Sequence, residues 1–246
     1  MLNEIAQLQK LIAACQSAVV FTGAGISTES GIPDFRSPGG IWSRFQPIEF
    51  SDFLVSEQAR RDAWRLKFLM SKDLHHAEPN RGHLAIAELV RRGVVSHVIT
   101  QNVDGLHQKS GVPDSQVIEL HGNMTYAHCL DCATRYELEP IQAAFECDET
   151  LPVCSRCGGL VKMATISFGQ PMPEQAMLQA QVAATSCDLF LAIGSSLVVY
   201  PAASFPLTAK RSNAKLVIIN RDSTDLDDEV DLLVHDEIGS VLSQLI

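Results

Sequence analysis

The stretch FTGAGISTESGIPDFR, Phe21–Arg36, decides the fold class. It follows the apolar run Ala18–Val20 and opens on Gly23 and Gly25. A glycine-rich turn directly after a buried strand is typical of α/β proteins that hold a phosphate. The spacing differs from the dinucleotide fingerprint GxGxxG, because Thr28 stands where the third glycine belongs, and no Lys-Ser/Thr pair follows as a P-loop requires. We therefore expect a phosphate-holding turn of a different kind.

Further short apolar runs, rich in Val and Ile, predict buried parallel strands. Amphipathic patterns between them predict helices, and this alternation indicates an open, doubly wound α/β sheet. Ligands of such sheets bind at the carboxyl ends of the strands. The expected strands are Ala18–Thr22, His97–Thr100, Val117–Leu120, Asp188–Ile193, Lys215–Asn220 and Leu232–His235, and the expected helices cover about 81–92, 174–185, 201–212 and 236–246.

Two stretches interrupt this alternation and are predicted to form a small second domain. Residues 41–80 have a helical pattern, whereas residues 125–163 carry two pairs of cysteines among turn-forming residues. The first domain would then consist of 1–40, 81–124 and 164–246.

The composition predicts an ordinary globular protein: 246 residues, 46% hydrophobic and 20% charged. A net charge of −10 argues against general binding to nucleic acid or to acidic membranes, since either needs a basic face. A Lys-rich peptide would be a compatible partner. Nothing in the composition specifies an oligomeric state.

The N-terminal residues predict an amphipathic helix, with Leu2, Ile5, Leu8, Leu11 and Ile12 along one face. This segment has no basic start and no sustained apolar core, so it does not resemble a secretion signal. Because no apolar run approaches the length of a membrane span, we expect a cytoplasmic protein.

The cysteines predict a metal site. Cys129-x2-Cys132 and Cys154-x2-Cys157 form two knuckles with the spacing of a zinc ribbon, and the total of seven excludes complete disulfide pairing. Four thiolates close a tetrahedral shell, so the zinc would be structural. Four reduced structural thiols, or a redox CxxC pair, remain the alternatives, with His128 and Cys147 as other possible ligands.

Small and amide-bearing residues lie at the ends of five of the predicted strands: Gly23–Gly25, Gln101-Asn102, His121-Gly122, Gly194-Ser195-Ser196 and Asn220. His121 lies level with Asp104, and an imidazole near a carboxylate can act as a general base near neutral pH. Asp104 either contacts a ligand or caps the helix that begins near it. His97, His107 and His235 lack comparable surroundings and are predicted to be structural.

These residues together resemble those of the sirtuins, NAD-dependent protein-lysine deacylases. The resemblance runs through Gly23–Ser27, Gly31–Arg36, Gln101–Asp104, His121-Gly122, the four cysteines, Gly194–Ser196 and Val199–Pro201. It implies a Rossmann-like large domain and a small domain built from a zinc-ribbon module and a helical module.

The resemblance also implies where NAD binds. The pyrophosphate would lie over Gly23, Ala24 and Gly25, near Ser195 and Ser196, and the adenine-side ribose near Asn220. The loop from Gly31 to about residue 44 would close over the nicotinamide half. The implied NAD-binding residues are Gly23, Ala24, Gly25, Ser27, Asp34, Phe35, Arg36, Gln101, Asn102, Val103, Asp104, Gly194, Ser195, Ser196 and Asn220.

In sirtuins the acyl oxygen of the substrate attacks the nicotinamide ribose and nicotinamide leaves. By resemblance His121 would be the base acting on the ribose hydroxyls, Asn102 would orient ribose and water, and Asp104 and Val103 would contact the nicotinamide amide. The products would be free lysine, nicotinamide and O-acyl-ADP-ribose.

An acetylated-lysine peptide would add as a strand beside Thr165–Gly169 and Ser196–Tyr200. Ile166, Phe168 and Val198 are the implied substrate contacts, and Phe35 and Val103 would help to line the acyl-lysine tunnel. The chain departs from the family pattern at Lys162-Met163-Ala164, Ser167 and Gln170.

Sirtuins acting on succinyl- or malonyl-lysine carry a Tyr and an Arg three residues apart in the helical module. The corresponding stretch, Trp64–Met70, has no Tyr-x-x-Arg. Deacetylation is therefore expected, and acidic acyl groups are expected to be poor substrates. ADP-ribosyl transfer and a non-catalytic NAD sensor are the alternatives, whereas the missing fingerprint glycine argues against a dehydrogenase.

Overall fold

A computed structural model describes residues 2–35, 40–41 and 46–246. Six parallel strands form the main sheet in the order β3-β2-β1-β7-β8-β9. They are β1 (Ala18–Thr22), β2 (Val95–Thr100), β3 (Val117–Glu119), β7 (Leu189–Ile193), β8 (Lys215–Ile219) and β9 (Leu232–Val234). All six lie where the sequence predicts strands, with ends that differ by at most two residues, and the sheet is Rossmann-like as expected.

Helices cover both faces of this sheet because its strands are apolar on both sides. In β1, Ala18 and Val20 pack on one face, with α1 (Leu2–Ala14), α4 (Arg81–Arg91) and α9 (Ile238–Leu242). Val19 and Phe21 pack on the other, with α7 (Glu174–Ser186) and α8 (Phe205–Arg211). The predicted helix at 201–212 begins as a 3-10 turn, Ala202–Ser204. The predicted C-terminal helix likewise ends in a 3-10 turn, Ser243–Leu245.

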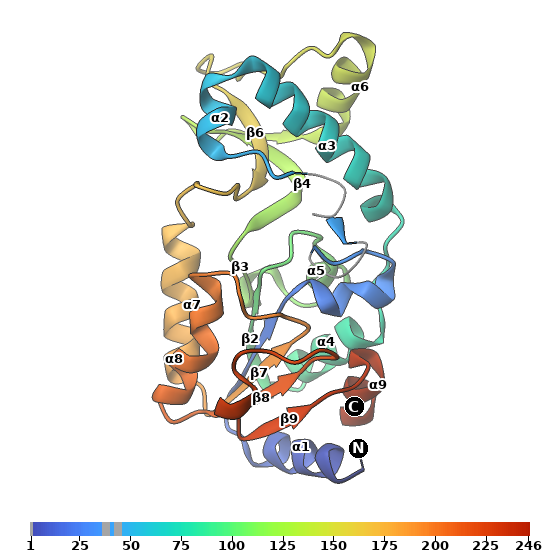
Figure 1. Ribbon diagram of the computed structural model, residues 1–246, viewed down its shortest axis with the longest axis vertical. Helices are drawn as coiled ribbons and strands as arrows, with labels where there is room; N and C mark the ends of the chain where they lie inside the picture. Colours follow the sequence, from blue (N-terminus) through green and yellow to red (C-terminus); the bar gives the residue numbers. More distant parts are fainter. Residues whose placement is uncertain (1, 36–39, 42–45) are drawn as a thin grey trace.

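A second, antiparallel sheet with the order β5-β4-β6 lies at the other end of the elongated molecule (Figure 1). Its strands are β4 (Gly122–Cys129), β5 (Arg135–Glu137) and β6 (Val161–Thr165). The helices beside it are α2 (Phe50–Val55), α3 (Glu57–His75) and α6 (Leu138–Asp148). Trp64 and Phe68 of α3 share an apolar cluster with Phe145 of α6 and with Cys129 and Cys154.

Helix α6 lies in the segment for which the sequence indicated turns. Its buried face consists of Leu138, Ile141 and Phe145 at helical spacing, a signal that the flanking cysteines obscured. The division of the chain into the predicted domains stays a prediction. Within the described residues no helix is long and apolar enough to cross a membrane.

A buried polar chain lies beneath the carboxyl ends of β1 and β2. The Thr22 hydroxyl donates to Thr100 Oγ1 at 2.8 Å, and His107 Nε2 lies 2.9 Å from Thr22 Oγ1. His83 packs edge-on against His107, with ring centroids 5.1 Å apart. His83 Nδ1 accepts the Asn80 N–H as part of the capping box that begins α4. His107 is thus structural, as predicted from its surroundings.

Both imidazoles are held neutral. Burial lowers the pKa of His83 to about 4, and burial together with the neighbouring His83 lowers the pKa of His107 to about 3. His83 Nε2 and His107 Nδ1 are buried with no hydrogen-bond partner among the described residues. A proton added to either ring would therefore place an uncompensated charge in the core.

We expect the free energy of unfolding to fall as the pH drops from about 6.5 towards 4. Over this range the unfolded chain takes up protons at these histidines and the folded chain does not. One such histidine contributes a loss on the order of 2 kcal/mol between pH 6.5 and 5. Urea denaturation across this range should show a shallower decline for His83→Gln than for the control His76→Gln, which changes an exposed histidine. Equal slopes in both variants would contradict this account.

Candidate functional site: two cavities that meet at His121

A polar cavity of about 180 Å³ lies at the carboxyl ends of the parallel strands. It opens between β1 and β7, where the chain order of the strands reverses, as expected for a doubly wound sheet. Its lining includes Gly23, Ala24, Gly25, Asp34, Phe35, Gln101, Asn102, His121, Gly194, Ser195, Ser196 and Asn220, all predicted from the sequence.

The glycine turn after β1 packs directly on the turn after β7. Gly23 N donates to Ile193 O at 3.1 Å, and Gly25 N donates to Gly194 O at 2.8 Å. A Cβ atom at Gly25 would lie 2.8 Å from the Gly194 backbone, so this approach requires glycine. Gly194 itself has φ of 64°, in the left-handed region. The result is a backbone-walled floor that a flat or anionic ligand group can approach closely.

The loop after β2 connects the floor of the cavity to its side. Asn102 Nδ2 donates to Gly23 O at 3.0 Å and to Ser27 Oγ at 3.2 Å. Gln101 Nε2 donates to Ser195 Oγ at 2.9 Å. These bonds fix the positions of both amides relative to the two turns.

Asp104 lies behind this lining. Its Oδ2 accepts the Ser27 hydroxyl at 2.8 Å, and its Oδ1 accepts the Leu106 N–H at 2.9 Å. The second bond closes a turn before α5 (Leu106–Lys109), whose N-cap residue is Gly105 without a side-chain cap, so Asp104 orders this loop and does not cap the helix. Burial raises the pKa of Asp104, although both hydrogen bonds oppose that rise. Asp104 and Ser27 therefore position the lining, and neither lines the polar cavity.

His121 follows β3 and directly precedes β4. Its Nδ1 lies 3.1 Å from Gln101 O, which can only accept a hydrogen bond. In the neutral imidazole the proton is thus on Nδ1, and Nε2 is the nitrogen that can take up a proton. Its backbone oxygen accepts the Ile166 N–H at 2.8 Å, which ties the loop after β6 to the same point.

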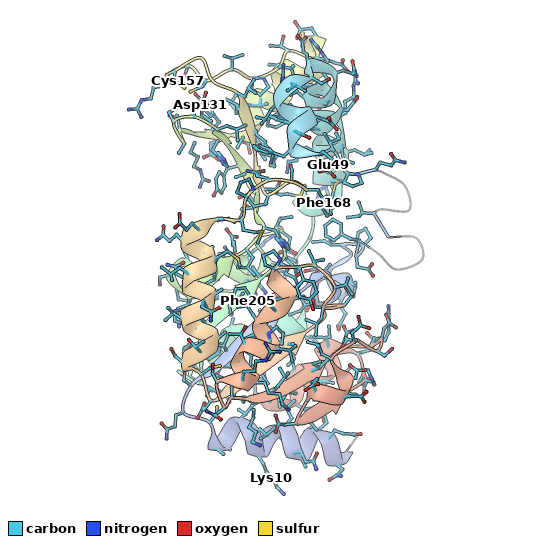
Figure 2. All side chains as sticks on the ribbon, turned by 60° about the vertical axis from the view of Figure 1, so that its left-hand side comes forward. Lys10, Glu49, Asp131, Cys157, Phe168 and Phe205 are labelled. Atoms are coloured by element: carbon cyan, nitrogen blue, oxygen red, sulfur yellow. The ribbon has the colours of Figure 1, made fainter. Side chains whose placement is uncertain are left out.

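A second, apolar cavity of about 380 Å³ lies on the other side of His121. Phe35, Gln101, His121 and Val199 line both cavities, so the two meet at these residues. Val103, Ile166 and Phe168 line the apolar cavity, as the sequence predicted for the acyl-lysine tunnel. Figure 2 shows Phe168 between the two halves of the molecule, close to Glu49. Phe168 O accepts the N–H of Phe50, the first residue of α2.

Four predicted contact residues do not line the polar or apolar cavity as expected, namely Ser27 and Asp104 behind the lining, and Val103 and Val198. Val103 lines only the apolar cavity, and Val198 lines neither, being 47% exposed. Arg36 lies outside the described residues. Further lining residues of the polar cavity follow β8 and β9, where only Asn220 was predicted from the sequence. They are Arg221, Asp222, Ser223, Asp236, Glu237 and Ile238, together with Thr28 and Glu29 beside the glycine turn.

The departures from the family pattern have visible positions. Gln170 Oε1 accepts the Ser167 N–H at 3.1 Å, and Gln170 N donates to Ser167 O at 3.0 Å, so these two residues close a turn. Lys162 and Met163 line the apolar cavity.

The four paired cysteines form one cluster, with all sulfurs within 4.8 Å of one another. The Sγ atoms of Cys129 and Cys157 are 3.5 Å apart, and those of Cys132 and Cys154 are 3.6 Å apart. Four sulfurs at about 2.3 Å from one zinc ion would be separated by similar distances. The Tyr136 hydroxyl lies 3.1 Å from Cys154 Sγ, a contact that would orient this ligand. His128 and Cys147 are not part of the cluster, so the residues fit a structural zinc held by four thiolates.

A Sir2 family model matches residues 23–201. A protein named NAD-dependent protein deacetylase from Rhodopseudomonas palustris is 52% identical over 98% of this chain and 96% of its own length. One named NAD-dependent protein deacylase 2, from Archaeoglobus fulgidus, is 42% identical over 99% of this chain and 95% of its own length. The chain belongs to the Sir2 family.

Solved structures of Sir2 enzymes have the same fold. A complex described as Sir2 with a p53 peptide and NAD+ aligns with a TM-score of 0.88 at 34% identity, covering 98% of this chain and 96% of the other. A second structure, described as Sir2Tm bound to a propionylated peptide, aligns with a TM-score of 0.84 at 34% identity, covering 98% and 97%.

We expect the purified protein to contain about one zinc ion per chain, and Cys157→Ser to lose it. The cluster shares its apolar core with Trp64, so loss of zinc should also loosen the second sheet and change tryptophan fluorescence. Metal analysis and thermal unfolding measure both effects. Cys147→Ser, at an exposed position outside the cluster, is the matched control. Zinc-free wild-type protein with unchanged unfolding would exclude a structural metal.

Proposed function

We propose that this chain removes acetyl and other acyl groups from lysine side chains of proteins, consuming NAD. The observation that carries this proposal is the position of His121, which lines a polar cavity fit for a dinucleotide and an apolar cavity fit for an acyl-lysine. A reaction between two substrates requires that their reacting atoms meet. His121 lies where the two cavities join.

In the polar cavity the glycine turns would bind the pyrophosphate of NAD through backbone N–H groups and close backbone contact. Ser195, Ser196 and Asn220 would contact the remaining phosphate and ribose oxygens. Asn102, fixed by Gly23 O and Ser27 Oγ, would orient the nicotinamide ribose. Phe35 and Asp34 would cover the nicotinamide end of NAD, and Arg36, two residues after Asp34, would also contact NAD.

The acyl-lysine would enter the apolar cavity between Phe35, Val103 and Ile166, with Phe168 and the exposed Val198 contacting the peptide. The acyl oxygen would attack C1′ of the ribose as nicotinamide leaves. In the neutral ring of His121 the Gln101 carbonyl favours the proton on Nδ1, so Nε2 would accept the proton of a ribose hydroxyl as the hydroxyl attacks the acyl carbon. Water would supply the remaining oxygen and hydrogens as the lysine amine leaves the acyl carbon, so acyl-lysine, NAD and water would give lysine, nicotinamide and O-acyl-ADP-ribose.

The peptide would lie across the segments 165–169 and 196–200 as an added strand. Tyr200 is 69% exposed and Phe168 43% exposed, so both side chains are accessible to a peptide lying along these segments. The proposed partners are thus acetylated proteins. A cytoplasmic location, where the thiolates of the zinc site stay reduced, remains part of the proposal.

His121→Ala should lower turnover of an acetyl-lysine peptide by at least about a hundredfold, the usual contribution of a general base. The variant should still bind NAD, because the backbone floor of the polar cavity is unchanged. Formation of O-acetyl-ADP-ribose is followed by mass spectrometry and NAD binding by calorimetry. The companion variant His97→Ala changes a half-buried histidine outside both cavities. If His121→Ala and wild type turned over equally, the assigned role of His121 would be wrong.

Gly25→Ala tests the NAD site independently of the base. The added methyl group would meet the Gly194 backbone at 2.8 Å and push the two turns apart. We expect NAD affinity to fall at least about tenfold while the zinc content stays at the wild-type level. Gly111→Ala, at a positive-φ glycine with nothing within 4 Å of its added Cβ, controls for backbone strain alone. Unchanged NAD affinity in Gly25→Ala would place the pyrophosphate elsewhere.

A further inference from the structure

Among the described residues that line the apolar cavity, two are lysines and none is an Asp or Glu. The lysines are Lys67, from α3, and Lys162, from β6. This is unexpected in a chain with 29 acidic and 19 basic residues. The polar cavity, by contrast, is lined by five carboxylates, those of Glu29, Asp34, Asp222, Asp236 and Glu237.

Both lysines are more deeply buried than lysines ordinarily are. Lys67 is 6% exposed and Lys162 is 3% exposed. Neither forms an ion pair with a carboxylate of the described residues, whereas Lys109, Lys210 and Lys215 each do. An ammonium group removed from water without a counter-ion is costly, so these two positions retain an unmet demand for negative charge.

Backbone carbonyls satisfy this demand only in part. Lys67 Nζ donates to Met124 O, and Lys162 Nζ donates to Thr165 O and, at 3.4 Å, to Met163 O. An ammonium group has three N–H donors, so two donors of Lys67 and one of Lys162 lack a described acceptor. Burial lowers the pKa of each lysine to about 8, and an anion bound nearby would favour the protonated form.

The same cavity would receive the acyl group if the proposed function holds, since it extends from His121 to α3 and β6. We propose that Lys67 and Lys162 bind the terminal carboxylate of a dicarboxylic acyl group on lysine, such as succinyl or glutaryl. The inference rests on the proposed deacylation and assigns a further substrate class to the same site. It opposes the expectation drawn from the missing Tyr-x-x-Arg, because the cations come from two separate elements and make no local motif.

The test compares peptides that differ only in charge. Malonyl-, succinyl- and glutaryl-lysine peptides are each paired with the ω-amide of the same length, and an acetyl-lysine peptide serves as reference. Binding is measured by calorimetry without NAD, and turnover with NAD is followed by mass spectrometry. We expect at least one acid to bind at least about tenfold more tightly than its amide, the effect of a charge-assisted hydrogen bond in a buried site.

Lys67→Met and Lys162→Met keep most of the side-chain length and remove its charge. Each should reduce the preference for acid over amide at least about tenfold, a ratio that any general loss of acyl-peptide binding or turnover would leave unchanged. Lys67→Arg should retain the preference. Lys215→Met, at an exposed site on β8, is the control and should behave as wild type.

The acid-to-amide ratio separates recognition from structure. If the lysines only support the carbonyls of Met124 and Thr165, their removal will weaken acid and amide equally and leave the ratio unchanged, which overturns the inference. Wild type that binds every acid no better than its amide also overturns it. If the acids bind preferentially but no peptide is turned over, the site assignment stands and the proposed deacylation fails. Should Lys67→Met fail to fold, Lys162→Met and the wild-type ratios still decide.

Discussion

The close contact between two backbone turns, Gly23–Gly25 after β1 and Gly194 after β7, determines the layout of the site. Neighbouring parallel strands normally leave a sheet on the same face, but here β1 continues towards β2 and β7 towards β8, so their exits diverge. The bond from Gly25 N to Gly194 O closes the floor between them. Larger residues at these positions would fill the space above this floor with side chains. The two facing glycines leave that space open to a ligand.

The side walls rest on a buried chain of polar residues. Thr22, Thr100 and His107 form this chain directly below the loop at Gln101, and Thr100 Oγ1 accepts the Asn102 N–H at 3.0 Å. These hydrogen bonds fix the backbone above them, although His107 Nδ1 has no partner among the described residues. Gln101 contacts residues on two sides of the polar cavity. Its carbonyl oxygen lies next to His121 Nδ1, and its side-chain amide donates to Ser195 Oγ. His121 and Ser195 are thereby held by the same residue.

Most of the sheet and of the polar cavity can be predicted from short stretches of the sequence. Strands buried on both faces appear as continuous Val/Ile runs, and the residues after them are small or amide-bearing, so the sheet and most of the polar cavity could be predicted. The cysteine spacing likewise predicts the cluster because each knuckle is a local turn. Residues such as Asp236 and Glu237 have no such signal, since only the pairing of β9 with β8 places them beside Asn220.

The positions of Lys67 and Lys162 are even harder to predict from the local sequence. Lys162 is visible in the sequence as a departure, and Lys67 as an ordinary charge within a helix whose neighbours Arg61 and Arg65 form exposed ion pairs. That both lysines line the apolar cavity depends on the packing of α3 against the second sheet and on the register of β6, in which Lys162 pairs with His128 of β4. The packing of α3 and the register of β6 are both features of the tertiary structure, which the local sequence does not reveal. Motif comparison across the helical module alone therefore yields the opposite expectation about acidic acyl groups.

The covalent position of His121 explains how the two cavities stay aligned. It separates β3, an edge strand of the parallel sheet, from β4, the central strand of the antiparallel sheet. The next residue, Gly122, has φ of 74°, and a Cβ atom there would lie 1.9 Å from Ala164 O. The chain can thus pass from one sheet to the other, close against β6, only with glycine at this point. His121 therefore lies at the junction of the two sheets, held by Gln101 O on one side and bonded through its own backbone oxygen to Ile166 on the other, where the two cavities meet.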